Sequence, residues 1–307
     1  MAQMSSAAST PLSSAAADPL QSQFARVRSR RSDFIRKLRK NTGAILGLFI
    51  LGLLVLAAIL APVITQYDPI AIDPVNRLQS PSREHWLGTD PFGRDLYTRV
   101  VYGARISLPV GIIAVVISAT TGTVLGLIAG FYGRITDGII MRLIDILLAF
   151  PDILLSLVIV AILGPNLRNV MIAVGIGGIP RYTRLVRGSV LSSRELLYVE
   201  AAKVIGVPNK VVLFRHILPN VIGPAVVLST LSVGSAILAA AGLSFLGLGA
   251  QPPTPEWGSM LAGGRQFLTT SPWVTSVPGI AIMLTVLSVN LFGDGLRDVL
   301  DPRSKKD

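Results

Sequence analysis

Residues 43–64 read GAILGLFILGLLVLAAILAPVI, a run without a single charged side chain. An apolar stretch of about 20 residues is long enough to cross the roughly 30 Å hydrocarbon core of a bilayer as an α-helix. A helix also satisfies every backbone hydrogen bond within itself, which the bilayer interior requires. The run therefore predicts a membrane-spanning helix over residues 44–64.

The composition of the whole chain agrees with this interpretation. Of its 307 residues 51% are hydrophobic and 15% are charged, and the mean hydropathy is +0.62. Soluble globular proteins have about 25% charged residues, so most of this surface should face lipid. The net charge of +11 fits cytoplasmic loops rich in Lys and Arg. It does not indicate a nucleic-acid partner, because no basic face interleaved with aromatic residues occurs outside the membrane flanks. The chain contains no cysteine, which excludes disulfides.

The segment before the first apolar run is basic. Eight Arg and Lys residues lie between Arg26 and Lys40, with Asp33 as the one acid, and residues 1–23 are rich in Ala and Ser. A cleaved signal peptide is disfavoured by the long leader and by the length of the apolar run. We predict that residues 1–40 form a disordered cytoplasmic tail and that the first span is retained.

Five further apolar stretches predict additional spans, at 106–131, 138–163, 170–190, 221–247 and 276–292. Six spans place both termini on one side of the cell membrane, and the Arg-rich segments predict that this side is the cytoplasm. The expected organisation has four parts: the tail 1–40, the first helix with an extracytoplasmic loop 41–100, a five-helix core 101–296 with a cytoplasmic loop at 195–220, and a cytoplasmic tail 297–307. The fold class is an all-α, multi-pass membrane protein.

Small residues recur at every fourth position of the second predicted span, at Ser118, Gly122, Gly126 and Gly130. This spacing places them on one helix face, where small side chains allow another helix to approach closely. We favour packing within the chain, and a subunit interface is the alternative.

The third predicted span contains the stretch MRLIDILLAFPDILLS. Arg142 and Asp145 are one turn apart and are expected to pair, and Pro151 is expected to kink the helix. Asp152 lies roughly 20 Å along the helix from Asp137 at about 1.5 Å per residue, deep in the membrane. A carboxylate at that depth should face a polar cavity or the bundle interior, which makes Asp152 a candidate for the translocation path. A purely structural role through a buried hydrogen bond is equally compatible.

The sequence shows no catalytic or cofactor motif. There is no GxxxxGK[ST] phosphate loop, and the glycine-rich pieces GIGGIP and GLSFLGLG do not fit GxGxxG. His85 and His216 are far apart, and neither has a metal-ligating partner at a helical spacing. Asp90 and Asp95 are expected to be solvated loop charges. We therefore predict a chain that is not an enzyme and binds no cofactor or metal itself.

The predicted cytoplasmic loop contains the stretch EAAKVIGVPNKVVLFRHILPN at residues 200–220. Ser193 is expected to cap a first short helix, Gly206 to close it in a left-handed turn, and Pro208 to prevent its continuation. A second helix should end before Pro219. Two short charged helices at an angle would present a stiff surface to a soluble cytoplasmic partner, although a re-entry loop without a partner is the alternative.

The pattern EAA, then a glycine, then ILP resembles the EAA loop of importer permeases of the ATP-binding cassette class. Four further runs are similar to one branch, the second permease subunit of dipeptide, oligopeptide, glutathione and nickel importers. They are HWLGTDPFGRDLYTRVVYGARISL at 85–108, MRLIDILLAFPDILL at 141–155, GLSFLGLGAQPPTPEWGSML at 242–261 and NLFGDGLRDVLDPR at 290–303. The resemblance extends over about residues 36 to 303, and the set in this order is highly specific.

The resemblance implies a type I importer permease fold with six transmembrane helices. It also implies four kinds of partner: a second, homologous permease subunit, two cytoplasmic ATPases that bind ATP and Mg, an external substrate-binding protein, and the lipid bilayer. Two sets of residues carry over from the family's EAA loop. Those of the coupling helix, which enters an ATPase cleft, are Glu200, Ala201, Ala202 and Gly206. Those that anchor it to the fifth span are Ile217, Leu218 and Pro219.

Two questions remain open at this point. The aromatic residues of the predicted outer loops, Trp86, Trp257 and Trp273, either contact the binding protein or lie at the membrane interface. The leading cargo is di- or oligopeptides, with glutathione or nickel as alternatives. An ion-coupled secondary transporter is disfavoured, because no convincing repeat relates 44–163 to 170–292. A channel or scaffold without an energy source would leave the EAA loop unexplained.

Overall fold

The computed structural model describes residues 36 and 38–300. In this part of the chain the regular elements are helices, apart from one isolated antiparallel bridge between Thr89 and Asp95. The prediction of an all-α fold is confirmed. Nearly all of the predicted tail 1–40, and residues 301–307 of the predicted C-terminal tail, lie outside the described residues.

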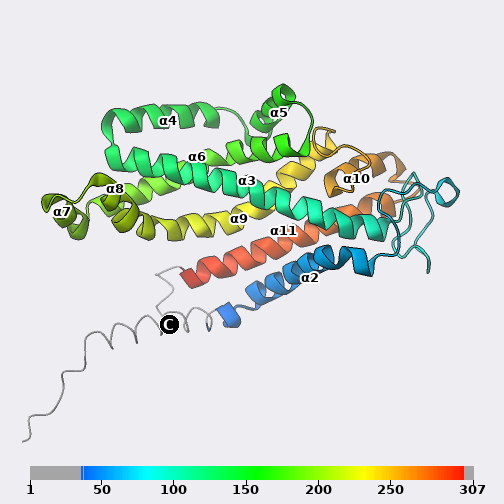
Figure 1. Cartoon of the computed structure of the whole chain (residues 1–307). Helices are drawn as coiled ribbons and strands as arrows, with labels where there is room; N and C mark the ends of the chain where they lie inside the picture. The colour runs from blue at the N-terminus through cyan, green and yellow to red at the C-terminus, as the bar shows by residue number, and fades with distance from the viewer. Residues whose placement is uncertain (1–35, 37, 301–307) are drawn as a thin grey trace, which may run out of the picture.

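The first span is α2, Thr42–Ile64, which begins after Asn41, whose side chain accepts a hydrogen bond from the Ala44 amide. The helix packs against α11, Trp273–Leu300, and the two lie side by side in Figure 1. Its buried residues are small, and at Gly47 an added Cβ would come within 2.5 Å of a backbone oxygen of α11. The opposite face exposes large side chains such as Phe49, which is the pattern of a helix bordered by lipid.

The second span is α3, Leu96–Tyr132, which runs beside α6, Leu167–Arg194. It begins earlier than predicted because Asp95 caps it by accepting a hydrogen bond from the Thr98 amide at 2.7 Å. The row of small residues faces α6 of the same chain. At Gly126, an added Cβ would lie 2.7 Å from the Thr183 carbonyl oxygen of α6. Packing within the chain therefore accounts for the spacing.

The third predicted span is broken rather than kinked. It consists of α4, Arg134–Leu148, and α5, Asp152–Leu163, whose axes differ by 91°. Pro151 occupies the position before α5 with an extended ψ of 136°, so the chain leaves the helical path before it resumes. The predicted pair of Arg142 with Asp145 is wrong, because Asp145 accepts a hydrogen bond from Arg184 of α6 at 2.7 Å.

The remaining elements complete two opposite ends of the bundle. The short helices α7, Leu197–Val204, and α8, Asn209–Val211, lie at one end in Figure 1. From α8 the chain continues through the π-helical η2, Val212–Ile217, into the long α9, Leu218–Phe245. The other end holds the loop after α2 with η1, Pro74–Asn76, and also α10, Trp257–Gly264. The short η3, Arg265–Phe267, follows α10.

Within residues 36 and 38–300, four helices are long and apolar enough to cross a membrane, and a fifth span results if α4 and α5 count as one. The four are α2, α3, the continuous stretch Asn209–Phe245, and Trp273–Val299. Helix α6 has the length, at 28 residues, but it carries several arginines. A multi-pass membrane protein is confirmed, whereas the count of six spans stays a prediction.

Candidate functional site

The turn at Gly206 forms as the sequence predicts. Gly206 has a φ of +82°, its amide donates to the Lys203 carbonyl at 3.0 Å, and the Val207 amide donates to the Ala202 carbonyl at 3.0 Å. This left-handed residue ends α7, and Pro208 precedes the next helical residue. The predicted cap at Ser193 is wrong, because α6 continues through that position and Leu196 precedes α7.

The second arm of this loop is the helical stretch that follows Pro208. We predicted that it ends before Pro219, and this prediction is wrong. The arm runs through η2 into α9 as one continuous helical stretch, with Pro219 in the first turn of α9. The π-helical turn before Pro219 changes the hydrogen-bond pattern locally, and this change accommodates the missing N–H of the proline. The arm is therefore joined to a long spanning helix without a flexible break.

We use the term knuckle for α7, the Gly206 turn, α8 and η2. Its inner face packs on the helix bundle through one hydrophobic cluster. The buried members from the knuckle are Val199, Ala202, Val212, Leu213 and Ile217, and those from the bundle are Leu127, Phe131, Val186, Val190, Val221 and Ala225. Because close-packed side chains resist deformation, a force applied to the knuckle is passed to α3, α6 and α9.

A polar clasp ties the two arms of the knuckle together. The Tyr198 hydroxyl of α7 donates to the His216 carbonyl at 3.3 Å, and the Asn220 side-chain amide donates to the same carbonyl at 3.0 Å and to the Tyr198 oxygen at 2.6 Å. Sequence reasoning missed Tyr198 and Asn220. The available signal was an asparagine directly after Pro219, at the start of a long helix.

The residues assigned to the coupling helix divide between two faces. Glu200, Ala201 and Gly206 are exposed, and Ala202 is buried against the bundle. Large apolar side chains are also exposed on the knuckle, and Leu197 is 83% exposed. Of the assigned anchor residues, Ile217 is buried, Leu218 is half-buried and Pro219 is exposed.

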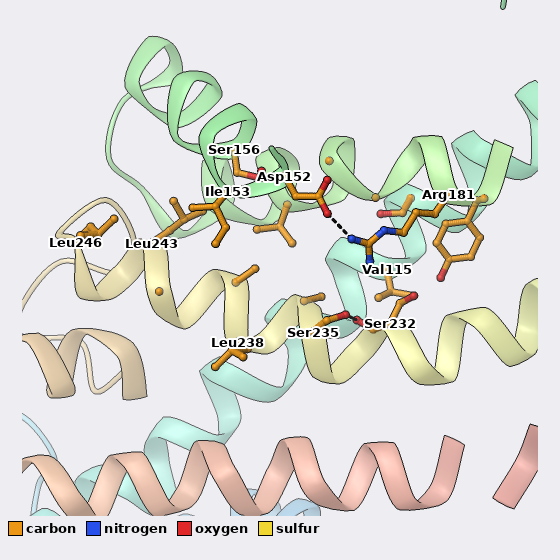
Figure 2. A pocket seen from close by; sticks show the side chains of 18 of the residues that line it. Val115, Asp152, Ile153, Ser156, Arg181, Ser232, Ser235, Leu238, Leu243 and Leu246 are labelled. Carbon is orange, nitrogen blue, oxygen red and sulfur yellow. Dashed lines mark hydrogen bonds and ion pairs between the residues drawn. The ribbon is translucent and has the colours of Figure 1, made fainter. Parts of the chain in front are cut away.

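Asp152, the first residue of α5, lies in a cavity of about 510 Å³ bordered by α3, α5, α6 and α9 (Figure 2). It forms an ion pair with Arg181 of α6, which sequence reasoning did not single out. Most of the other lining side chains are apolar or small. An acid at the first position of a helix is also stabilised by the helix dipole.

This ion pair is one of three between α6 and the broken span. The pairs are Arg181–Asp152, Arg184–Asp145 and Arg187–Asp137. The arginines recur at every third position and so share one face of α6. The two helices α4 and α5 of the broken span thus supply a carboxylate partner for each of these arginines. The sequence could not reveal these partners, because each is 29 or more positions away.

The acids of the outer loop are not solvated, contrary to prediction. Asp90 and Asp95 are 4% and 3% exposed. Asp90 accepts hydrogen bonds from the Phe92 and Arg94 amides and from the Arg94 guanidinium at 2.7 Å, and Asp95 caps α3 and contacts His85 at 3.0 Å. The loop folds back over the N-terminus of α3, where backbone amides and basic side chains replace water as partners.

The three tryptophans have different environments. Trp257 is fully buried, its indole N–H donates to the Val100 carbonyl at 2.9 Å, and its ring lies against Gly103. The expected docking role of Trp257 is inconsistent with this burial. Trp273 is partly buried, and Trp86 is 59% exposed. Of the three tryptophans, Trp86 therefore keeps the largest exposed fraction in the isolated chain.

Glu256 is a buried acid that the sequence did not single out. It precedes α10, outside the candidate spans, and is 3% exposed. Its carboxylate accepts hydrogen bonds from the amides of Gly258 at 2.9 Å and Ser259 at 2.8 Å. Burial raises the pKa of Glu256, and these two hydrogen bonds oppose that effect.

This pKa shift predicts a pH-dependent stability. With a raised pKa, the folded chain keeps the Glu256 proton to a higher pH than the unfolded chain does. The contribution to stability is therefore complete below the unfolded-state pKa and is lost as pH rises through the folded-state pKa. As pH rises above the ordinary pKa of a glutamate, the unfolding temperature in detergent should fall more steeply for the unmodified protein than for Glu256→Gln, whose side chain does not titrate. Equal slopes for the two proteins would contradict the assignment.

The described residues contain no group of three or more His, Cys, Asp or Glu side chains that could hold a metal ion. The charged groups that the structure does bring together are ion pairs and helix caps. These ion pairs and caps hold side chains and helix ends in place. The three features described above are the knuckle at one end of the bundle, the cavity within it, and the folded outer loop.

Comparisons with known proteins agree with the geometry. Residues 122–306 match the family described as binding-protein-dependent transport system inner membrane component, and residues 29–81 match the N-terminal TM domain of oligopeptide transport permease C. A dipeptide transport system permease protein of Alkalihalophilus pseudofirmus is 53% identical over 94% of this chain and 94% of its own length.

Two other relatives have similar coverage. A glutathione transport system permease protein of Pectobacterium atrosepticum is 47% identical over 91% of this chain and 93% of its own. A di/tripeptide transport system permease protein of Pseudomonas aeruginosa is 46% identical over 89% and 92%. The resemblance inferred from the motifs is thus confirmed, and the helical bundle is the type I importer permease fold. The chain belongs to the family of inner-membrane components of binding-protein-dependent transport systems.

Proposed function

We propose that this chain is a permease subunit of an ATP-driven importer of short peptides. Two of the three relatives described above are named for dipeptides or di- and tripeptides, and the third is named for glutathione, which is itself a tripeptide. The shared substrate class is a short peptide. Glutathione remains the second candidate because a relative at 47% identity is named for it.

The observation that supports ATP-driven transport best is the attachment of the knuckle to the bundle. The sequence has no phosphate-binding loop, so free energy has to enter by contact with a partner. Of two cytoplasmic ATPases, which bind ATP and Mg, one docks on the exposed face around Glu200, Ala201 and Gly206, and the other docks on the second permease subunit. Their closure moves the knuckle together with α9, because η2 and α9 are continuous and the clasp at Tyr198 joins both arms.

Alternating access follows from two states of this coupled unit. One state opens the cavity at Asp152 to the outside and the other opens it to the cytoplasm. The ATPases shift the balance by binding the two states with different affinity. In this proposal a second, homologous permease completes the path, both termini lie in the cytoplasm, and six spans cross the cell membrane.

The outer end of the bundle receives cargo from an external binding protein. The loop between α2 and α3 is held in a defined shape by the buried Asp90 and Asp95, and it exposes Trp86 together with Val75. A rigid loop with exposed apolar side chains suits docking of another protein, because little conformational entropy is lost on binding.

Reconstitution in vesicles tests the proposal. The chain, co-purified with its second permease and ATPases, should accumulate radiolabelled Leu-Leu only when ATP and the binding protein are both supplied. An imposed proton or sodium gradient without ATP should give no accumulation. Uptake by the chain without any ATPase, driven by such a gradient, would instead identify an ion-coupled secondary transporter.

A further inference from the structure

The cavity beside Asp152 has two chemically different ends (Figure 2). At one end the Asp152 carboxylate and the Arg181 guanidinium point toward each other, and Ser232 of α9 lies below them. At the other end the lining includes Leu243 and Leu246. The volume of about 510 Å³ is within the range of roughly 300–1,000 Å³ that small-molecule sites occupy. The cavity is therefore amphipathic and large enough for a short peptide.

The ion pair in the cavity uses only part of its hydrogen-bonding capacity. One guanidinium nitrogen of Arg181 contacts one carboxylate oxygen of Asp152. In one of the two pairs outside the cavity, Arg187 donates from two nitrogens to both oxygens of Asp137, at 2.5 and 2.6 Å. The side chains of Arg181 and Asp152 are 56% and 49% exposed, whereas those of Arg187 and Asp137 are 30% and 20% exposed. Donors of Arg181 and an oxygen of Asp152 thus remain open to a ligand.

We propose that Arg181 and Asp152 form a site for the two charged termini of a short peptide in transit. Arg181 binds the terminal carboxylate, Asp152 binds the terminal ammonium, and an apolar side chain of the peptide lies toward Leu243 and Leu246. This inference rests on the proposed function, because it assigns a cargo site to the same permease. It predicts selection for free termini within the membrane, in addition to any selection by the binding protein.

The chemistry of the pair suits passage better than tight binding. A guanidinium offers several donors to a carboxylate, and such charge-assisted hydrogen bonds are the stronger ones. When a zwitterionic peptide enters, Arg181 exchanges the Asp152 carboxylate for the peptide carboxylate. Asp152 exchanges the Arg181 guanidinium for the peptide ammonium. When the peptide leaves, Arg181 and Asp152 pair again, so neither charge is left unpaired at membrane depth. Binding and release both avoid the large penalty of an isolated charge.

Equilibrium dialysis on the purified permease–ATPase complex, without the external binding protein, tests the site. The probes are radiolabelled Leu-Leu, with Leu-Leu amide and N-acetyl-Leu-Leu as competitors that lack one terminal charge each. The unmodified complex should prefer Leu-Leu over either blocked peptide by about tenfold or more. Arg181→Gln should lose the preference for Leu-Leu over Leu-Leu amide and keep the preference over N-acetyl-Leu-Leu. Asp152→Asn should lose the preference over N-acetyl-Leu-Leu and keep the preference over Leu-Leu amide.

Arg184→Gln is the matched control, because Arg184 lies on the same helix, pairs with an aspartate through one contact and is 55% exposed, but does not line the cavity. It should keep both preferences. The exchanged pair, D152R with R181D, should also keep both, since a zwitterion can bind in the reverse orientation.

Two results would overturn the site. The first is that the unmodified complex binds the three peptides equally well. The second is that the folded single variants bind all three peptides more weakly by the same factor. If the unmodified complex accumulates Leu-Leu with ATP yet shows no such preference, the site alone is wrong. If it shows no ATP-dependent accumulation, the proposed function itself is wrong.

Discussion

Replacing Gly206 with valine should strongly reduce coupled uptake while leaving a permease that inserts and assembles. Gly206 has a φ of +82°, and nothing lies within 4 Å of an added Cβ, so the substitution strains the backbone without a steric clash. A left-handed conformation costs an L-residue about 1–2 kcal/mol, and more for a β-branched side chain. A free-energy change of this size shifts the population of the native turn by about tenfold. Uptake of Leu-Leu into vesicles should therefore fall by about tenfold or more, measured at matched amounts of protein.

Gly206→Asn is the control for this prediction. Asparagine adopts positive φ more readily than other L-residues do, so this variant should retain most of the uptake. The valine variant should still co-purify with its second permease, because a Cβ at position 206 would meet no neighbouring atom within 4 Å. Uptake by Gly206→Val at the unmodified rate would refute coupling through the knuckle.

Replacing Gly126 with valine should destabilise the folded helix bundle. A Cβ at this position would lie 2.7 Å from the Thr183 carbonyl oxygen and 2.8 Å from the Val186 Cβ, both on α6. Backbone atoms cannot move aside as a flexible side chain can, so α3 and α6 must separate. Overpacking of this kind costs about 1–3 kcal/mol or more, and the unfolding temperature should fall by up to roughly 10 °C. Thermal unfolding of the purified protein in detergent measures the change.

Gly138→Val provides the comparison, because Gly138 lies in α4 with nothing within 4 Å of an added Cβ. Both variants replace a glycine within a helix by valine, so the change in helix propensity is the same for the two. If Gly126→Val unfolded at the same temperature as Gly138→Val, the close contact of α3 with α6 would not be the reason for the row of small residues.

Local features of the sequence predicted most of the fold. The uncharged run at 43–64 became α2, at Thr42–Ile64. The glycine between two short helical patterns became the left-handed turn at Gly206. The prediction for Pro151 was right in position and wrong in extent, because the chain breaks into two helices at 91° instead of bending. Helix propensity and the missing N–H of proline determine where a helix is interrupted. Packing against neighbouring helices determines the angle between its two parts.

Partners across the bundle could not be predicted in the same way. Arg142 seemed the natural partner of Asp145 because it is one turn away, but Arg184 of α6 lies opposite it instead. Asp90 and Trp257 seemed exposed because they occur in loops, and both are buried where those loops fold onto α3.

By itself the sequence determined the lipid-facing helices, the knuckle turn and the family, because these depend on residue type and on spacing over a few turns. The tertiary structure alone decided which charges pair, which loop residues are buried, and that Asp152 and Arg181 share one cavity. The physical reason is that a charge or an indole N–H takes the partner that is closest in space. That distance is set by how distant helices pack, and no short stretch of sequence records it.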